Sequence, residues 1–279
     1  MERPWSRYSC GMDINGMFLE SGNQGRQGME SRRFRLSRSK MFDFLDELEA
    51  AGGKAKSLYL PSGLSLVEVE SLLKEALETP MIPPGLAELV VSSETGAILF
   101  WGFYRRCLVL PPFPVTERYL AHSYDATILR SLLKRSFTVA LILIRLGAYA
   151  IGICQGEKLI ASKNGTGLVH ARHKQGGSSQ QRFERHREKQ IEYFLDRVCQ
   201  HVREQLEPRA KAVDYVVYGG ARTTILLLRK RCAFLQQFDN RTLPPLLTIP
   251  EPRKAVLEAA IGDVWSSTVV EWYDSEVLA

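Results

Sequence analysis

The chain has 279 residues, of which 45% are hydrophobic and 24% charged, and its formal net charge is +6. This length and composition fit a soluble globular protein with one large domain or two modest ones. The longest apolar run, from Phe137 to Ile144, is far shorter than the roughly 20 residues that cross a membrane. The N-terminus lacks the apolar segment of a signal peptide, so we expect a cytoplasmic protein with no membrane partner.

Five cysteines are spread along the chain without CxxC spacing. An odd number of scattered cysteines argues against a disulfide framework and against a structural zinc site. We therefore expect inert or buried thiols at Cys10, Cys107, Cys154, Cys199 and Cys232.

The N-terminal segment is rich in glycine, serine and arginine and has little apolar periodicity. We predict a flexible leader over residues 1–30. The basic run SRRFRLSRSK follows, from Ser31 to Lys40. A solvated strand or linker is the favoured interpretation of this run, and an auxiliary RNA contact is the alternative.

Helical and β patterns alternate in the next part of the chain. Apolar residues at helical spacing predict helices over residues 40–51 and 67–78. The segment SLYLP predicts a strand between them, and the β-rich runs ILFWGF and RCLVLPPF predict a hairpin that turns at Tyr104-Arg105. We therefore predict a small α+β N-terminal domain over residues 31–120.

The second half begins with three β-rich runs, FTVALILIRLG, AYAIGICQG and EKLIASKNG, joined by short glycine-containing turns. Their order predicts an antiparallel meander. A long helix is predicted from about Gln180 to Leu206, because its apolar residues recur on one stripe, and Pro208 ends it. The stripe consists of Ile191, Phe194, Leu195, Val198, Val202 and Leu206.

The remaining segments alternate between strands and helices. VDYVVYGG predicts a strand, residues 221–238 a helix, LLTI a short strand and the chain from about Pro252 a last helix. Together with the meander they indicate a mixed α/β sheet with helices on its faces, as in ribonuclease-H-like folds, within an α+β chain. We assign residues 121–279 to this C-terminal domain.

Metal and nucleotide sites are not expected. Zinc would need three or four ligands in fixed geometry, and no cysteine or carboxylate pattern joins the histidines of the basic segment, which itself repels cations. Gly219-Gly220 is interpreted as a tight strand-to-helix turn, because GxxxxGK[ST] and GxGxxG are both missing from the sequence. We expect no cofactor, and we interpret the histidines as facing solvent or RNA: His170, His173, His186 and His201.

The excess positive charge is concentrated between Lys163 and Lys189. Seven Lys or Arg residues stand there against two Glu, whereas the other 252 residues carry 30 basic and 29 acidic groups. Within this segment, KQGGSSQQRF combines glycines that let a backbone approach a ligand closely with uncharged donors and acceptors. The flanking charges fit a polyanion such as RNA, and a solvated loop without chemistry is the alternative. The candidate RNA-binding residues are Lys163, Arg172, His173, Lys174, Arg182, Arg185, Arg187 and Lys189.

The segment from Lys174 to Gln180, preceded by the meander and followed by an arginine-rich helix, resembles the catalytic domain of the Vms-like release factor (VLRF) family. These proteins are relatives of the eukaryotic and archaeal class I translation termination factors and act on peptidyl-tRNA in ribosome-associated quality control. The resemblance covers residues 130–275. It implies a release-factor-like fold and a hydrolase that cleaves the peptidyl-tRNA ester of stalled chains on the large ribosomal subunit.

In that family a Gly-Gly loop carries a glutamine that helps water attack the ester. The resemblance therefore implies that Gly176 and Gly177 shape the loop and that Gln180, in preference to Gln181, positions the water. It also implies rRNA and peptidyl-tRNA as partners and a monomer off the ribosome. Two alternatives stay open: a non-catalytic ribosome-binding or RNA-binding factor, and an endonuclease that cuts the tRNA 3′ end with a histidine such as His173 as acid or base.

Overall fold

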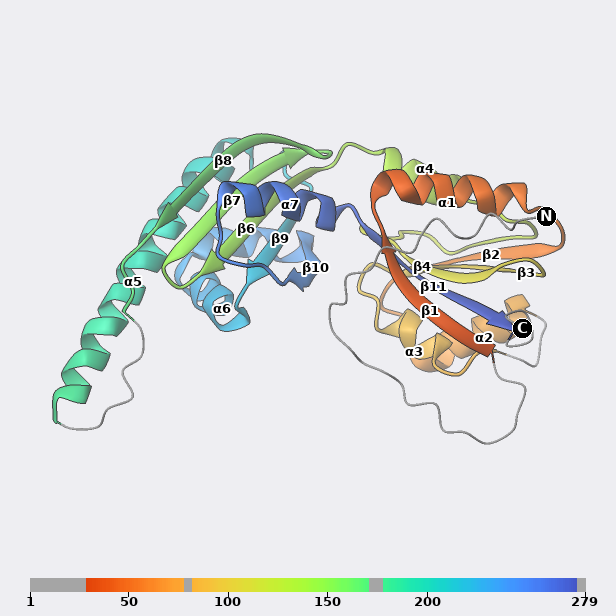
Figure 1. Ribbon diagram of the computed structural model, residues 1–279, viewed down its shortest axis with the longest axis horizontal. Coiled ribbons are helices and arrows are strands. Elements are labelled where there is room, and N and C mark those ends of the chain that lie inside the picture. The colour runs from red at the N-terminus through yellow and green to blue at the C-terminus, as the bar shows by residue number, and fades with distance from the viewer. Residues whose placement is uncertain (1–28, 78–81, 171–177, 275–279) are drawn as a thin grey trace, which may run out of the picture.

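The computed structural model describes residues 29–77, 82–170 and 178–274, and these residues form two lobes that follow one another along the long axis (Figure 1). Each lobe is built on its own β-sheet. Within the described residues, none of the helices has the length and apolarity that a bilayer crossing requires.

The first lobe contains an antiparallel six-stranded sheet in the order β1-β11-β4-β3-β2-β5. Its strands are β1 (Met29–Leu36), β2 (Ala55–Leu60), β3 (Ala97–Gly102), β4 (Arg106–Leu110), β5 (Tyr119–Ala121) and β11 (Ser267–Asp274). The hairpin predicted from ILFWGF and RCLVLPPF is confirmed as β3 and β4, but its turn lies at Phe103-Tyr104, one residue earlier than predicted.

Helices cover both faces of this sheet (Figure 1). They are α1 (Arg38–Ala50) and α4 (Thr127–Lys134) on one face, and α2 (Leu66–Leu77) and α3 (Leu86–Val91) on the other. Alternate residues of a strand therefore enter two different cores, as Phe100 and Leu99 of β3 do. The helices predicted over residues 40–51 and 67–78 are confirmed as α1 and α2.

The last strand of the chain corrects the predicted domain division. β11 lies between β1 and β4 in the first sheet, so residues 267–274 do not belong to the C-terminal domain predicted over residues 121–279. α4 also packs in the first lobe, through Leu129 and Leu133. β1 begins at Met29 and so includes the last residues of the predicted leader, whose first 28 residues lie outside the described part of the chain.

The second lobe contains a five-stranded mixed sheet in the order β10-β9-β6-β7-β8. β6, β9 and β10 run parallel, whereas β6, β7 and β8 form the predicted antiparallel meander. α5 and α6 cover one face of this sheet and α7 covers the other, so the predicted mixed sheet with helices on its faces is confirmed. The elements are β6 (Thr138–Arg145), β7 (Ala148–Gln155), β8 (Lys158–Thr166), α5 (Ser178–Leu206), β9 (Tyr215–Gly220), α6 (Arg222–Arg231), β10 (Thr242–Leu247) and α7 (Lys254–Val264).

The region after β9 differs in detail from the prediction. The helix predicted over residues 221–238 ends at Arg231, and a 3-10 helix, η3 (Ala233–Arg241), follows it. The strand predicted as LLTI begins earlier, at Thr242. Gly219 and Gly220 are the last residues of β9, and Ala221 alone separates them from α6, so the predicted tight connection from strand to helix is present. Only Gly220 needs a glycine's freedom, because its φ is 119° and a Cβ there would lie 1.9 Å from the carbonyl oxygen of Ile144 on β6.

An aromatic cluster joins the two lobes. Phe113, which follows β4 in the first lobe, packs against Phe137, Tyr215 and Trp265 with ring centroids 4.5, 5.5 and 4.6 Å away. The indole of Trp265 also donates a hydrogen bond of 3.0 Å to the carbonyl oxygen of Gly156. These contacts bury rings from both lobes in one core and so fix the lobes against each other.

The basic run from Ser31 to Lys40 also serves this junction. Arg35 donates a hydrogen bond of 2.9 Å to the carbonyl oxygen of Asp263. Arg38 lies 3.3 Å from Glu157 and stacks over the ring of Trp265 at 4.5 Å. The strand interpretation of the run is confirmed up to Leu36, whereas Arg38 already belongs to α1, and these two arginines have a structural use.

The cysteine prediction is wrong at two positions. Cys199 of α5 and Cys232, just after α6, form a disulfide, which the lack of a CxxC motif had argued against. The two cysteines are separated by 33 residues and meet because α5 and α6 pack side by side on one face of the sheet. Cys107 and Cys154 are buried free thiols as expected, and Cys10 lies outside the described residues.

Candidate functional site

α5 divides into two segments with opposite surroundings. The inner segment, residues 191–206, buries the predicted apolar stripe against the sheet, and Phe194 and Val198 are 2% and 0% exposed. In the outer segment, residues 178–190, the described side chains from Arg182 onward are exposed or half-buried. Figure 1 shows the outer segment projecting beyond the sheet, at the end of the molecule opposite the first lobe.

The chain that leaves β8 runs back along α5 toward its outer end. Arg197 donates a hydrogen bond to the carbonyl oxygen of Thr166, and Arg187 donates one of 3.0 Å to the carbonyl oxygen of His170. The ten residue steps from Arg187 to Arg197 rise about 15 Å along the helix, and the four steps from Thr166 to His170 span about 13 Å when extended. The connection from β8 is therefore hydrogen-bonded along α5 as far as His170. This contact supports the outer segment from one side.

The predicted site residues fall at the end of this supported segment. Gln180 and Gln181 lie in the first turn of α5, which begins at Ser178 and so confirms the predicted start of the helix. Fourteen residues separate Gln180 from Phe194, the first fully buried side chain, which places this turn about 21 Å beyond the core. Gly176 and Gly177 lie outside the described residues, as do the candidate RNA-binding residues Arg172, His173 and Lys174.

The remaining basic candidates do not all gather at one place. Arg182, Arg185 and Lys189 are exposed on the outer segment, and Arg187 is half-buried against His170. Lys163 is exposed on β8 near the inner segment, where the pKa of Glu204 is lowered mainly by its hydrogen bonds with His201 and Gln200 and to a smaller extent by the charge of Lys163. The outer segment therefore presents a positive surface to which Lys163 does not contribute directly.

The described histidines occupy two separate environments. His170 and His186 lie near each other, with ring centroids 6.4 Å apart, and Gln190 contacts the backbone of the first and the ring of the second. His201 belongs to the inner segment and stacks on Tyr149 of β7 at 5.6 Å. Among the described residues, no three or more His, Cys, Asp or Glu side chains are grouped to hold a metal ion.

Contacts that the sequence did not predict fix the inner segment to α6. Arg231 binds the carboxylate of Asp196 through two hydrogen bonds, which lower the pKa of Asp196. The Cys199–Cys232 disulfide lies alongside this ion pair. Neither pairing has a local sequence signal, since each joins residues more than 30 positions apart.

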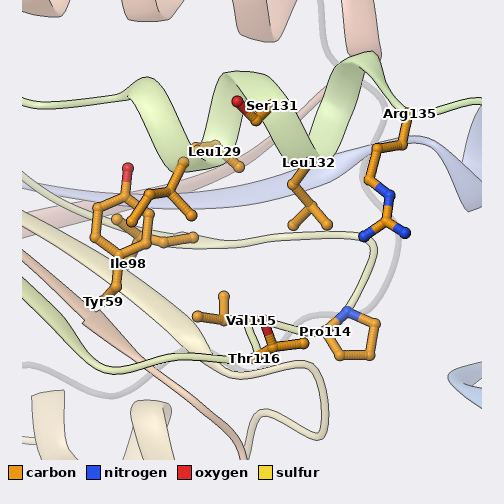
Figure 2. A pocket seen from close by; sticks show the side chains of 10 residues that line it. Tyr59, Ile98, Pro114, Val115, Thr116, Leu129, Ser131, Leu132 and Arg135 are labelled. Atoms are coloured by element: carbon orange, nitrogen blue, oxygen red, sulfur yellow. The ribbon is translucent and has the colours of Figure 1, made fainter.

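A cavity of about 160 Å³ lies apart from α5, in the first lobe (Figure 2). Leu129 and Leu132 of α4 line it together with Val115. Tyr59, on its wall, donates a hydrogen bond of 2.8 Å to a backbone carbonyl oxygen, and Arg135 stacks on an aromatic ring of the lobe junction. Tyr59 and Arg135 therefore take part in the packing of the first lobe and of the lobe junction.

The comparison with protein families covers the lobe that carries α5. Residues 137–270 match the Actinobacteria/chloroflexi VLRF1 release factor family, acVLRF1. The resemblance to the VLRF family that the sequence predicts is thereby confirmed over this span, which runs from the start of the meander into β11.

Two archaeal proteins named peptide chain release factor subunit 1 are similar to the chain over a longer span. The protein from Aeropyrum pernix is 26% identical in an alignment of 215 positions that covers 66% of this chain and 57% of that protein. The protein from Picrophilus torridus is 26% identical in an alignment of 226 positions that covers 70% of this chain and 55% of that protein. The chain thus spans little more than half of the length of these relatives.

Solved structures show a weaker similarity. The archaeal translation termination factor aRF1 aligns over 82% of this chain and 73% of its own, with 17% identity and a TM-score of 0.37. A structure described as an archaeal protein aligns over the same shares, with 17% identity and a TM-score of 0.35.

Proposed function

We propose that the protein is a peptidyl-tRNA hydrolase that releases stalled nascent chains on the large ribosomal subunit. The observation that carries the proposal is the outer segment of α5, whose first turn holds Gln180 and Gln181 about 21 Å beyond the core. The VLRF1 family match over residues 137–270 and the similarity to release factor subunit 1 proteins support it.

The chemistry that we propose needs a positioned water rather than a protein nucleophile. Water attacks the carbonyl carbon of the peptidyl ester, the bond to the ribose 3′ oxygen breaks, and that oxygen leaves with a proton. The products are a peptide acid and a tRNA with an intact terminal adenosine. A neutral glutamine amide can accept from the water and donate to the developing oxyanion, and one such donor contributes about 10²- to 10³-fold in rate.

The positive face of the outer segment is the proposed RNA-binding surface. Arg182, Arg185 and Lys189 are exposed there, and the N-terminus of a long helix adds partial positive charge in the first turn. Each phosphate contact releases counterions, so binding to rRNA and to the tRNA acceptor end should weaken as salt is added. Gly176 and Gly177 are proposed to shape the loop that precedes the helix.

The test is release of a radiolabelled nascent chain from purified stalled large-subunit complexes. We expect the wild type to release the chain. Adjacent helical positions lie about 100° apart around the axis, so the two glutamines should not act equally. Since the family resemblance favours Gln180, we expect Gln180→Ala to slow release more than Gln181→Ala. Gln236→Ala is the matched control, since Gln236 is exposed on η3 and does not belong to the outer segment of α5. Full activity of a variant that carries both Gln180→Ala and Gln181→Ala would contradict the proposal.

The same reaction separates the proposal from its alternatives. Mapping the tRNA 3′ end should show an intact terminal adenosine, whereas a shortened end would favour an endonuclease that uses a histidine such as His173. Salt-dependent co-sedimentation of the wild type with large subunits, without release from any stalled complex, would favour a non-catalytic binding factor.

A further inference from the structure

The turn between β3 and β4 carries two aromatic side chains that the fold does not bury. Phe103 is 81% exposed and Tyr104 is 65% exposed, and their rings pack edge to face with centroids 5.3 Å apart. The turn is tight, since the amide of Gly102 donates a hydrogen bond of 2.9 Å to the carbonyl oxygen of Arg105. Two-residue turns of this kind favour Gly, Asn or Asp, so neither turn geometry nor core packing accounts for the two rings.

The backbone behind the two rings is held by a buried tyrosine. The hydroxyl of Tyr124 accepts a hydrogen bond of 2.9 Å from the amide of Arg105 and donates one of 2.8 Å to its carbonyl oxygen. A Cβ on Gly102 would lie 2.3 Å from this hydroxyl, so the turn and the tyrosine fit closely. The rings are therefore presented on a fixed support, which lowers the entropy cost of binding a ligand.

Two carboxylates near the turn, those of Glu47 and Glu271, are engaged with arginines. The guanidinium of Arg105 is buried over the ring of Phe44 and lies 3.5 Å from Glu271 and 3.4 Å from Glu47. Glu271 also binds Arg32 at 2.6 Å. This network neutralises the charges of Glu47 and Glu271 below the turn, so these two carboxylates do not repel an anion that binds at the outer surface of the turn.

Basic residues flank the two rings. In the strand register, Trp101 of β3 lies opposite Lys56 of β2 on one side and Arg106 of β4 on the other. The guanidinium of Arg106 lies over the indole ring of Trp101 at 5.6 Å. Lys54 is exposed directly before Ala55, which pairs with Gly102 at the end of β3. Exposed aromatic faces bordered by Lys and Arg are the combination that binds single-stranded nucleic acid, with stacking for the bases and charge for the phosphates.

We propose that this aromatic turn, Phe103-Tyr104, is a second RNA-binding site, which stacks on unpaired bases while Lys54, Lys56 and Arg106 contact the adjacent phosphates. It lies at the end of the first sheet where β11 finishes, at the opposite end of the long axis from the outer segment of α5 (Figure 1). The proposal goes beyond the proposed release function and does not depend on it. If both sites are used, the chain spans two RNA elements along its length.

The test uses a short single-stranded RNA and an abasic strand of the same length, each labelled with fluorescein and titrated with the full chain by anisotropy. The wild type should bind the strand with bases about tenfold more tightly than the abasic strand. Phe103→Leu with Tyr104→Leu keeps the apolar surface but removes the aromatic faces, and it should abolish this preference. Phe103→Tyr with Tyr104→Phe keeps the faces and should retain it.

Three outcomes would overturn the proposal. The first is an unchanged preference in the leucine variant, and the second is equal binding of the two strands by the wild type. The third is a leucine variant that binds both strands as the wild type does under all salt conditions yet no longer co-sediments with ribosomal subunits, which is the form of the first outcome that would assign the turn to a protein partner. Release from stalled complexes is measured separately, so its failure leaves the stacking result interpretable. Both rings are exposed, and unfolding midpoints equal to wild type should show that all variants fold.

Discussion

The inner and outer segments of α5 belong to one continuous helix but differ in composition and in what surrounds them. The inner segment buries Phe194 and Val198 in the core and is tied to α6 by a disulfide and by Arg231. The outer segment is exposed, basic and unsupported by the sheet. An isolated helix of this length is marginal in water, so the outer turns depend on the anchored turns behind them.

This dependence runs in one direction. Damage to the inner segment should lower the stability of the fold and the action of the outer segment together. Changes in the outer segment should alter RNA binding or release and leave unfolding unchanged.

Replacing a buried ring of the inner segment should have the largest effect on stability. Phe194→Ala removes a side chain that is 2% exposed, so we expect the free energy of unfolding to fall by about 3–5 kcal/mol in a denaturant titration. Tyr193→Ala is the matched control, because the ring of Tyr193, next to Phe194 in the chain, is 75% exposed. This substitution should change the free energy of unfolding by less than about 0.5 kcal/mol. Equal losses of unfolding free energy in the two variants would contradict the division of α5 into a buried and an exposed face.

Removing the disulfide should weaken the same anchor by a smaller amount. Cys199→Ser with Cys232→Ser opens a loop of 33 residues, and we expect a loss of about 2–4 kcal/mol in unfolding free energy. Wild type treated with reductant should match the variant. If the variant and the oxidised wild type unfold at the same denaturant concentration, the disulfide does not anchor α5.

Removing charge from the outer segment should affect RNA binding without affecting stability. Arg182→Gln with Arg185→Gln should lower the slope of log affinity against log salt by about 1.4 for single-stranded RNA, if each arginine meets one phosphate. Lys158→Gln with Lys211→Gln is the control, since both lysines are exposed elsewhere in the second lobe. A similar change of slope in both pairs would indicate general charge attraction rather than a binding face.

The buried thiols of the sheets should resist modification while the chain is folded. Burial raises the pKa of Cys154 to about 12, so only about one thiol in ten thousand is ionised at pH 8. We expect slow alkylation by iodoacetamide in the native state and fast alkylation in denaturant. Because the unfolded thiol ionises at a lower pH than the folded one, this group should also destabilise the fold as the pH rises above about 9. Fast alkylation of native Cys154 would contradict its burial.

The sequence predicts the local parts of this structure well. The apolar stripe from Ile191 to Leu206 is a helical pattern that tertiary packing does not override, and the meander has strong β-rich runs with short turns. The family resemblance follows from the same region, since glycines, glutamines and arginines are adjacent in the chain there.

The parts that the sequence misses depend on distant partners. β11 pairs with β1 from the other end of the chain, and nothing in its composition says which sheet it joins. The contact of Cys199 with Cys232 requires α5 and α6 to share a face of the sheet. The aromatic turn at Phe103-Tyr104 appears in the sequence only as a hairpin with unusual turn residues, because exposure is a property of the folded surface.

The most direct test of the account is the single-turnover rate of nascent-chain release at saturating protein, measured together with the fraction of stalled complexes that are bound. A variant with both Gln180→Ala and Gln181→Ala should bind to the same extent as the wild type and release at least about 100-fold more slowly. Release at the wild-type rate by this variant, at equal bound fraction, would contradict a catalytic role for the first turn of α5.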